Sequence, residues 1–205
     1  MQFIDLREEL KDFAVFNLND IRKIEADFDL RRLNEWSGKG YIKNIRRGFY
    51  HFSDLRISEP ELFLIANKIY SPSYVSLEIA LSAYNLIPEA VYGVTSVTSQ
   101  KTNSFATGIG NFIYKHIKPE LMFGYELREH GNHRYAIARI EKAVLDFLYL
   151  NPRFGNNSDF DGLRFNAAEF KAGADMAKFD KYLGAFGNNV LSRRAGKFIK
   201  FINNA

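Results

Sequence analysis

The sequence contains no cysteine, and this absence excludes several classes of chemistry. Without a thiol, the chain forms no disulfide scaffold and binds neither an iron–sulfur cluster nor a zinc ion through cysteine. A cysteine nucleophile is excluded for the same reason. A cysteine-free composition fits a reducing compartment such as the cytoplasm.

Long apolar runs are also missing. No stretch approaches the roughly 18 apolar residues that span a bilayer. Residues 1–13 mix acids and bases, whereas a signal peptide has a basic region followed by an apolar one. We therefore expect a cytoplasmic protein without a membrane partner. A chain of 205 residues, 46% apolar and 25% charged, is typical of a globular protein with one large domain or two small ones.

Basic and acidic residues are separated along the chain. Residues 1–30 contain four basic and eight acidic residues, whereas residues 31–50 contain six basic residues and a single acid. A second basic cluster comprises Arg193, Arg194, Lys197 and Lys200. Such segregation is typical of a surface that binds phosphates, since a merely solvated face usually mixes both signs.

The first 54 residues predict a winged helix-turn-helix domain. Apolar residues at helical spacing predict three short helices, the third with Leu30, Leu33 and Trp36 facing the core. Two β-prone runs follow within 41–53, and Gly48 between them provides the positive φ of a tight turn. Three helices followed by a basic hairpin are the outline of this domain.

Residues 55–205 predict a second, larger α+β domain. A capping box at Ser58 begins one helix, and Ser76 begins another that ends at Pro88. The run 89–138 is rich in β-branched and aromatic residues separated by polar turns, which predicts antiparallel strands. Helical spacing returns over 140–150 and predicts flanking helices. The fold class expected for the whole chain is α+β.

The third helix and the hairpin after it form the strongest candidate site. A recognition helix presents long polar side chains to the major groove, where arginine reads guanine and asparagine reads adenine, and cations on a wing hold phosphates. The residues with these properties are Arg31, Arg32 and Asn34 on the helix and Lys43, Arg46 and Arg47 on the hairpin. The alternative is a winged fold that contacts protein and whose basic residues are only solvated.

Two further groups of polar residues are weaker candidates. The stretch 94–107 has seven Ser or Thr residues, and we interpret it as a strand and loop with a polar outer face rather than a phosphorylated or nucleotide-binding edge. Lys142 and Asp146 are four residues apart and are expected to pair on a helix surface. Glu141 is a candidate buried acid that anchors a turn or meets a base of a partner. Catalysis by these three residues is not favoured.

Neither a metal nor a cofactor is expected. The run from Asn157 to Gly162 imitates the start of a calcium loop, but Ala168 stands where the loop needs a bidentate carboxylate. His130 and His133 are the one close histidine pair and lie in an expected hairpin loop. No phosphate-binding glycine loop and no nucleophile elbow occur in the sequence. We therefore assign no catalytic residue.

Three blocks of sequence together resemble those of a known protein family. They are WSGKGYIKNIRRGFY at 36–50, SPSYVSLEIALSAYNLIPE at 71–89 and IARIEKAVLDFLYL at 137–150. Their content and order resemble the AbiEi antitoxin family, over roughly residues 30–200 of this chain. The middle block is the most specific. One departure precedes Glu141, where the family usually has proline or a small residue and this chain has Arg139–Ile140.

The resemblance implies a bifunctional protein. In the family, which supplies the antitoxin of bacterial type IV toxin–antitoxin and abortive-infection systems, a winged helix binds inverted repeats upstream of its own operon and represses it. The C-terminal domain counteracts a toxin that resembles a nucleotidyltransferase. Double-stranded DNA and such a toxin are thus the implied partners. The family's basic positions fall on Arg31, Arg32, Lys39, Lys43, Arg46 and Arg47. Its antitoxin-domain signature falls on Ser73, Tyr74, Ser76, Glu141, Lys142 and Asp146.

A second interpretation assigns the chain to a different class of protein, the enzymes. Residues 60–205 are then an enzyme that acts on the toxin or on nucleotides, and the winged helix is its targeting module. The lack of a recognisable metal or nucleotide motif favours the first interpretation. The function expected is that of a DNA-binding autoregulator and antitoxin without enzymatic activity.

Overall fold

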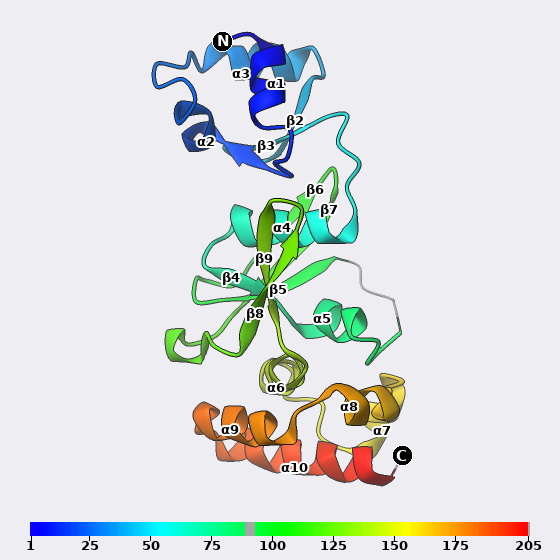
Figure 1. Ribbon diagram of the computed structural model, residues 1–205. Coiled ribbons are helices and arrows are strands. Elements are labelled where there is room, and N and C mark those ends of the chain that lie inside the picture. Colours follow the sequence, from blue (N-terminus) through cyan, green and yellow to red (C-terminus); the bar gives the residue numbers. More distant parts are fainter. Residues whose placement is uncertain (89–92, 205) are drawn as a thin grey trace.

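The computed structural model describes residues 1–88 and 93–204, apart from the side chain of Asn157. The chain is an α+β protein, as expected from the sequence. Figure 1 shows three tiers from top to bottom: a small N-terminal unit, a sheet with its helices, and a group of C-terminal helices. The first residues of the expected β-prone run, 89–92, lie outside the described residues.

The N-terminal unit combines three short helices with a small sheet. Its elements are α1 (Phe3–Glu9), β1 (Phe16–Asn17), α2 (Leu18–Arg22), α3 (Arg31–Gly38), β2 (Ile42–Arg46) and β3 (Phe49–Phe52). β3 lies between β1 and β2 and is antiparallel to both. Leu6, Phe16, Leu33 and Trp36 belong to a hydrophobic core that is separate from the core of the other tiers.

Local sequence explains where these short elements begin and end. Asn17 caps α2, because its Oδ1 accepts hydrogen bonds from the backbone N–H groups of Asn19 and Asp20 at 2.8 and 3.1 Å. Gly48 has a φ of 83°, which permits the tight β2–β3 turn that the sequence predicts. The expectation for Leu30 is wrong: this side chain is 49% exposed, because α3 begins only at Arg31.

A six-stranded sheet forms the middle tier, with strand order β6-β7-β5-β4-β9-β8. Its strands are β4 (Ser73–Val75), β5 (Val94–Thr98), β6 (Asn103–Thr107), β7 (Gly110–His116), β8 (Tyr125–His130) and β9 (His133–Ala138). β5 is parallel to β7 and β4 is parallel to β9, whereas the other neighbours are antiparallel. The sheet is thus mixed, while the sequence predicts antiparallel strands only.

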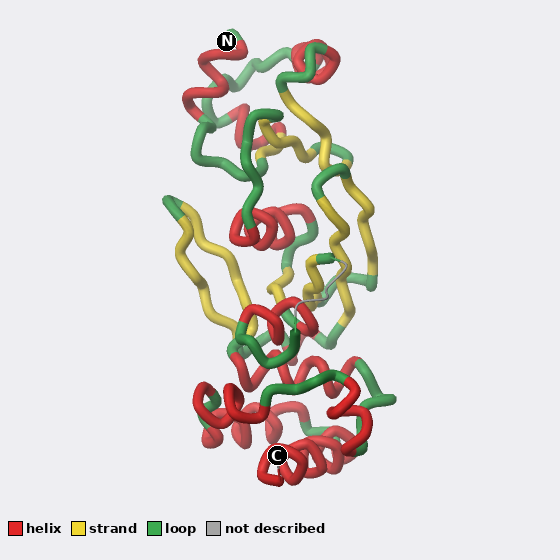
Figure 2. Tube along the Cα trace, turned by 90° about the vertical axis from the view of Figure 1, so that its right-hand side faces the viewer, coloured by secondary structure: helices red, strands yellow, loops and turns green. Residues whose placement is uncertain are grey.

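Helices pack on both sides of this sheet. α4 (Glu59–Ile69) contacts β4, β5 and β9 on the side that faces the N-terminal unit. Figure 2 shows α4 between the β8–β9 and β6–β7 hairpins. α5 (Leu77–Ala83) and α6 (Ile140–Leu150) pack together on the other side, and a short 3-10 helix, η1 (Pro119–Leu121), precedes β8. α5 is shorter than the sequence predicts, since that helix was expected to reach Pro88.

β5 does not have the polar outer face expected for the Ser/Thr-rich stretch. All five of its residues are buried, because β5 lies inside the sheet and helices cover it. Two of its three hydroxyl groups have partners within the protein: Thr95 Oγ1 donates to the Ser76 carbonyl oxygen and Thr98 Oγ1 to that of Pro72, each at 2.7 Å. The third, Ser96 Oγ, is buried without a hydrogen bond to the described residues. Within the Ser/Thr-rich stretch, the edge strand β6 exposes three of its five positions.

The C-terminal tier contains four helices that pack around aromatic residues. They are α7 (Asn157–Gly162), α8 (Ala167–Gly173), α9 (Met176–Phe186) and α10 (Asn189–Asn204). The ring of Phe198 lies 5.4 Å from that of Phe160 and 5.3 Å from that of Phe170. Gly187, with a φ of 56°, ends α9 in the left-handed conformation. No helix among residues 1–88 and 93–204 is long and apolar enough to cross a membrane.

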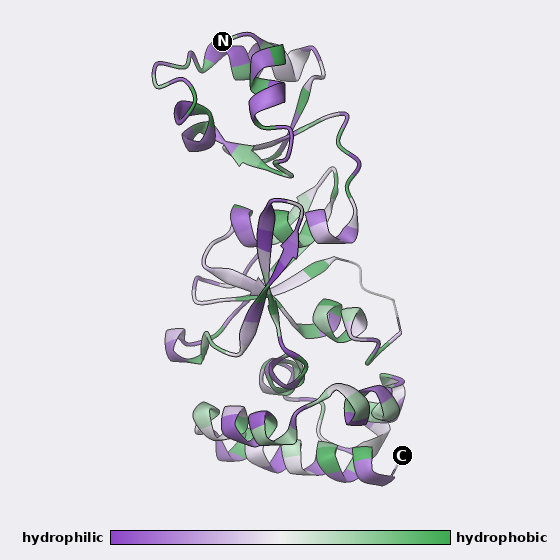
Figure 3. Cartoon of the chain, viewed as in Figure 1, coloured by the Kyte–Doolittle hydropathy of each residue, from purple (hydrophilic) through white to green (hydrophobic). Residues whose placement is uncertain are grey.

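The N-terminal unit rests on the middle tier through apolar and polar contacts. Ala14, Val15 and Ile45 belong to the N-terminal unit in sequence but pack with the larger hydrophobic core. Figure 3 shows that the centre of the sheet is hydrophobic, whereas the end of the β8–β9 hairpin next to the N-terminal unit is hydrophilic. The junction therefore has an apolar part and a polar part.

Candidate functional site

α3 presents to solvent two of the side chains that the sequence selects for base contacts. Leu33 and Trp36 are buried in the core of the unit, whereas Arg31 and Asn34 are exposed. Asp29 fixes the start of the helix, because its Oδ1 accepts a hydrogen bond from the backbone N–H of Arg31 at 3.0 Å. Its carboxylate also pairs with the Arg31 guanidinium at 3.2 Å. These hydrogen bonds from Arg31 lower the pKa of Asp29.

The remaining helix residues are less free than the sequence suggests. Arg32 is only partly exposed, and its guanidinium donates a hydrogen bond to the carbonyl oxygen of Met1, so the expectation that it lies free on the outer face is wrong. Lys39 is exposed and pairs with Glu35 one turn earlier at 2.6 Å. The hydrogen bond between them raises the pKa of Lys39 and lowers that of Glu35.

The β2–β3 hairpin supplies two cations without a partner. Lys43 lies in β2 and Arg47 in the turn, and both side chains are exposed. Neither side chain has an ion pair or a hydrogen bond within the described part of the chain. They are thus available for an external anion without the loss of an internal contact.

Arg46 faces the middle tier, although the sequence places it on the exposed wing. Its Nη1 donates a hydrogen bond to the carbonyl oxygen of Ile69 at 2.6 Å, at the end of α4. Its guanidinium lies 4.3 Å from the ring centre of Phe105 in β6 and 5.8 Å from that of Tyr70. The expectation of an exposed wing cation is wrong here, because Arg46 packs against aromatic rings of the sheet.

Four of the six signature residues meet in one buried cluster. Tyr74 comes from β4, Ser76 from the start of α5, and Lys142 and Asp146 from successive turns of α6. Asp146 Oδ2 accepts hydrogen bonds from Tyr74 Oη at 2.8 Å and Ser76 Oγ at 2.9 Å, and its Oδ1 accepts one from Lys142 Nζ. All four residues have no exposed surface. The expected surface pair of Lys142 and Asp146 is therefore a buried pair.

The location of α6 explains this burial. α6 packs against α5, α9 and α10, so the sheet tier lies on one side of it and the C-terminal helices on the other. Lys142 Nζ lies 4.5 and 4.9 Å from the ring centres of Phe186 and Phe123. Burial lowers the pKa of Lys142 and raises that of Asp146, in opposition to their mutual attraction. The cluster joins β4, α5 and α6 and has no exposed surface from which it could reach a substrate.

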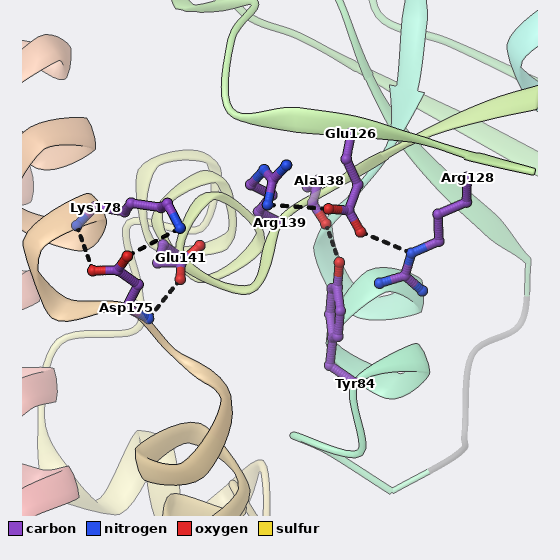
Figure 4. A network of polar contacts seen from close by, with 8 residues as sticks. All are labelled: Tyr84, Glu126, Arg128, Ala138, Arg139, Glu141, Asp175 and Lys178. Atoms are coloured by element: carbon purple, nitrogen blue, oxygen red, sulfur yellow. Dashed lines mark hydrogen bonds and ion pairs between the residues drawn. The ribbon is translucent and has the colours of Figure 1, made fainter.

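The two other signature residues have separate surroundings. Glu141 is buried, and its Oε1 accepts a hydrogen bond from the backbone N–H of Asp175 at 2.7 Å, just before α9 (Figure 4). This confirms the interpretation of Glu141 as a buried acid that anchors a turn. Ser73 Oγ is buried without a hydrogen bond in the part of the chain that the structure describes.

Figure 4 also shows a polar network that the sequence analysis missed. Glu126 in β8 pairs with Arg128 at 2.9 Å and with Arg139 at 3.2 Å. Tyr84 Oη donates a hydrogen bond to the Ala138 carbonyl oxygen at 2.9 Å, and burial raises the pKa of Tyr84 to about 12. The alternation of apolar and charged residues in 125–128 was a signal for it, because every second residue of a strand lies on the same face.

The residues tested as metal ligands have structural partners. His130 Nε2 lies 2.7 Å from Glu61 Oε1, and Asp159 Oδ2 accepts hydrogen bonds from the backbone N–H groups of Gly155 and Asn156 at 2.8 and 3.0 Å. Within residues 1–88 and 93–204, no three His, Asp or Glu side chains gather as metal ligands do.

Comparisons with known proteins add no relative. Neither the scan against protein-family models nor the search of curated proteins returned a match for this chain.

Proposed function

We propose that the chain is a DNA-binding autoregulator whose N-terminal unit is a winged helix. The order of its elements supports this proposal: β1 precedes α2, the strands β2 and β3 follow α3, and the three strands form one antiparallel sheet. One observation carries the proposal: Lys43 and Arg47 are exposed cations without a partner among the described residues, on the hairpin that directly follows the exposed polar face of α3. This combination suits a helix in the major groove and a wing on the phosphates.

The surroundings of each side chain divide the contacts into two kinds. The ion pair with Asp29 fixes the position of the Arg31 guanidinium. A guanidinium fixed in this way suits two hydrogen bonds to a guanine base. Asn34, on the same exposed face, suits adenine. Lys43 and Arg47 suit phosphates, which carry no sequence information. Arg46 has no part in this division, because it is engaged with Ile69 and Phe105.

Fluorescence anisotropy tests this proposal. The purified chain is titrated onto a duplex from upstream of its own gene and onto a scrambled duplex, over a series of salt concentrations. We expect tight binding that falls steeply with salt and prefers the upstream duplex. Equal binding to both duplexes contradicts the proposal and favours a winged unit that contacts protein.

We further propose that the middle and C-terminal tiers form an antitoxin domain that counteracts a nucleotidyltransferase-like toxin. The support is the resemblance to the AbiEi family together with the convergence of Tyr74, Ser76, Lys142 and Asp146, which come from distant parts of the sequence. Because this cluster is fully buried, these residues act by holding the domain together and do not touch a toxin. The toxin then meets another surface of the domain.

Co-expression tests the antitoxin proposal. A nucleotidyltransferase-like toxin encoded beside this chain is induced in a bacterial host with the chain under a separate promoter, so that repression of the toxin gene plays no part. We expect growth to be restored. Continued growth arrest, with the chain folded and present at equal amount, contradicts the proposal. Metal-dependent turnover of nucleotides by the purified chain would instead favour the enzyme interpretation of residues 60–205.

A further inference from the structure

β8 forms an open edge of the six-stranded sheet. Within the described residues it pairs only with β9, and it stands at one end of the strand order. Figure 2 shows the β8–β9 hairpin at the left side of the molecule. An open edge can pair with a further strand, and proteins usually prevent this with proline, lysine or a bulge. Residues 125–130 contain neither proline nor lysine, and they pair with β9 in one continuous register.

The hydrogen bonds between β8 and β9 show which residues face the open edge. The Arg139 N–H donates to the Gly124 carbonyl oxygen at 3.0 Å, and these two residues are opposite each other in the continuation of the β8–β9 register. In an antiparallel pair, hydrogen-bonded and non-hydrogen-bonded positions alternate. The backbone N–H and C=O groups of Tyr125, Leu127 and Glu129 therefore face away from β9. None of these three N–H groups has a hydrogen bond to the described residues.

The side chains of β8 suit a second, identical strand. Leu127 is 59% exposed although it is apolar, and Tyr125 on the same face is also exposed. Glu126 and Arg128 lie on the opposite face, where both are partly exposed and pair with each other at 2.9 Å. One face thus offers apolar surface, and the other offers one charge of each sign.

An antiparallel β8–β8 pair centred on Leu127 satisfies both the backbone and the charges. The free N–H groups belong to odd-numbered residues, so odd-numbered residues must stand opposite each other. The centre at Leu127 brings the two Leu127 side chains together and places each Glu126 opposite Arg128 of the second copy. A centre at Glu126 or at Arg128 instead places two like charges opposite each other, which is destabilising.

We propose that two copies of the chain associate through β8, in an antiparallel pair centred on Leu127 that joins their two sheets into one. Tyr125 then exchanges hydrogen bonds with Glu129 of the second copy, and the two Leu127 residues exchange them with each other. The dimer has twofold symmetry, which is also the symmetry of an inverted repeat in DNA. The proposal does not rest on DNA binding, because β8 contains no residue of that interface.

Sedimentation equilibrium of the full chain without DNA tests the dimer. Leu127→Lys places two ammonium groups opposite each other, at an exposed position where the fold tolerates a polar side chain. Ile4→Lys makes the same change at an exposed position of α1 and is the control. We expect the unmodified chain and Ile4→Lys to dimerise alike, and Leu127→Lys to associate at least about tenfold more weakly.

Two results of this experiment overturn the proposal. A chain that stays monomeric up to about 1 mM leaves the β8 edge to a strand of another protein. A dimer that Leu127→Lys weakens no more than Ile4→Lys does uses another surface.

Two charge reversals test the register. Glu126→Arg gives β8 two arginines and Arg128→Glu gives it two glutamates, so like charges meet when either variant pairs with itself. In a mixture of the two variants, each arginine stands opposite a glutamate. We expect each variant alone to dimerise at least about tenfold more weakly than the unmodified chain, and the mixture to regain association. Two variants that are folded by circular dichroism but do not associate when mixed contradict the register.

Hydrogen exchange of the unmodified chain tests the same register without a substitution. The N–H groups of Tyr125, Leu127 and Glu129 should exchange more slowly as the protein concentration rises, because they become paired in the dimer. The Arg128 N–H faces β9 in the monomer as well, so its exchange should depend much less on concentration. Equal dependence at all four positions, or none, overturns the proposal.

Discussion

The Arg46 guanidinium donates a hydrogen bond to the carbonyl oxygen of Ile69 at 2.6 Å and so ties the β2–β3 hairpin to the last turn of α4. The same guanidinium packs against Phe105 of β6. One side chain thus joins the N-terminal unit to two elements of the middle tier. The two neighbouring arginines of the hairpin therefore differ: Arg46 contacts the middle tier, whereas Arg47 is exposed to solvent.

Replacement of Arg46 should weaken the junction between the two tiers. Arg46→Ala removes a charge-assisted hydrogen bond and a cation–π contact at a partly buried position, so we expect a loss of about 1–2 kcal/mol in the free energy of unfolding. Arg47→Ala removes an exposed side chain that has no partner in the described part of the chain and should change the free energy of unfolding by less than about 0.5 kcal/mol. Urea unfolding followed by circular dichroism measures both, and equal losses in the two variants contradict the division.

The salt dependence of DNA binding separates base contacts from phosphate contacts. Arg47→Ala should weaken binding to all duplexes alike and reduce the slope of log K against log salt by about one unit, since one phosphate contact is lost. Arg31→Ala should cost about 1–3 kcal/mol on the upstream duplex and relax preference at one base position. Anisotropy titrations on single-base variants of the duplex measure both effects. If the two variants behave alike, the assigned roles are wrong.

The buried pair of Lys142 and Asp146 should show strong coupling. Lys142→Met leaves Asp146 as a buried carboxylate without its cation, which costs about 3–5 kcal/mol, and Asp146→Leu leaves the ammonium unpaired at a similar cost. The double variant buries neither charge, so its loss should be smaller than the sum of the single losses. Chemical denaturation of all four proteins measures this difference. Additive losses contradict a coupled pair.

The pH dependence of Lys142→Met follows from the same contacts. Burial already raises the pKa of Asp146, and removal of the ammonium takes away an attraction that lowers it, so the pKa rises further. The folded state then binds a proton more tightly than the unfolded state, whose Asp has a pKa near 3.8. Stability therefore increases as the pH falls from the folded pKa toward that value. We expect the deficit of this variant to be smaller at about pH 5 than at about pH 7, and a constant deficit contradicts the assignment.

Elements with a strong local signal could be predicted from the sequence. α6 covers 140–150, as its apolar spacing predicts, and the Ser58 N–H donates to Glu61 Oε2 at 2.9 Å in the predicted capping box. β4 could not be predicted, because three residues are too few to show a period of two. It nevertheless lies between β5 and β9, where pairing with distant strands determines its conformation.

The candidate site shows the same limit. The exposure of Arg31 and Asn34 follows from helical spacing, since Leu33 and Trp36 occupy the buried face. The burial of Lys142 depends instead on the C-terminal helices that pack over α6, which the spacing within 140–150 does not reveal. The contacts of Arg46 with the middle tier are of the same kind. They depend on how the tiers pack together, which local sequence patterns do not predict.

Glu141 should stabilise the start of α9 through a single hydrogen bond. Glu141→Leu retains the bulk of the side chain but leaves the Asp175 N–H without its acceptor in a part-buried position, at a cost of about 1–3 kcal/mol. Glu141→Gln keeps an oxygen that accepts this hydrogen bond and should lose much less. Hydrogen exchange of the Asp175 amide and the first turn of α9 measures the effect locally, and faster exchange is expected in Glu141→Leu only. Faster exchange in both variants would show that the charge of Glu141 also matters, as it does for an acid near the positive end of a helix.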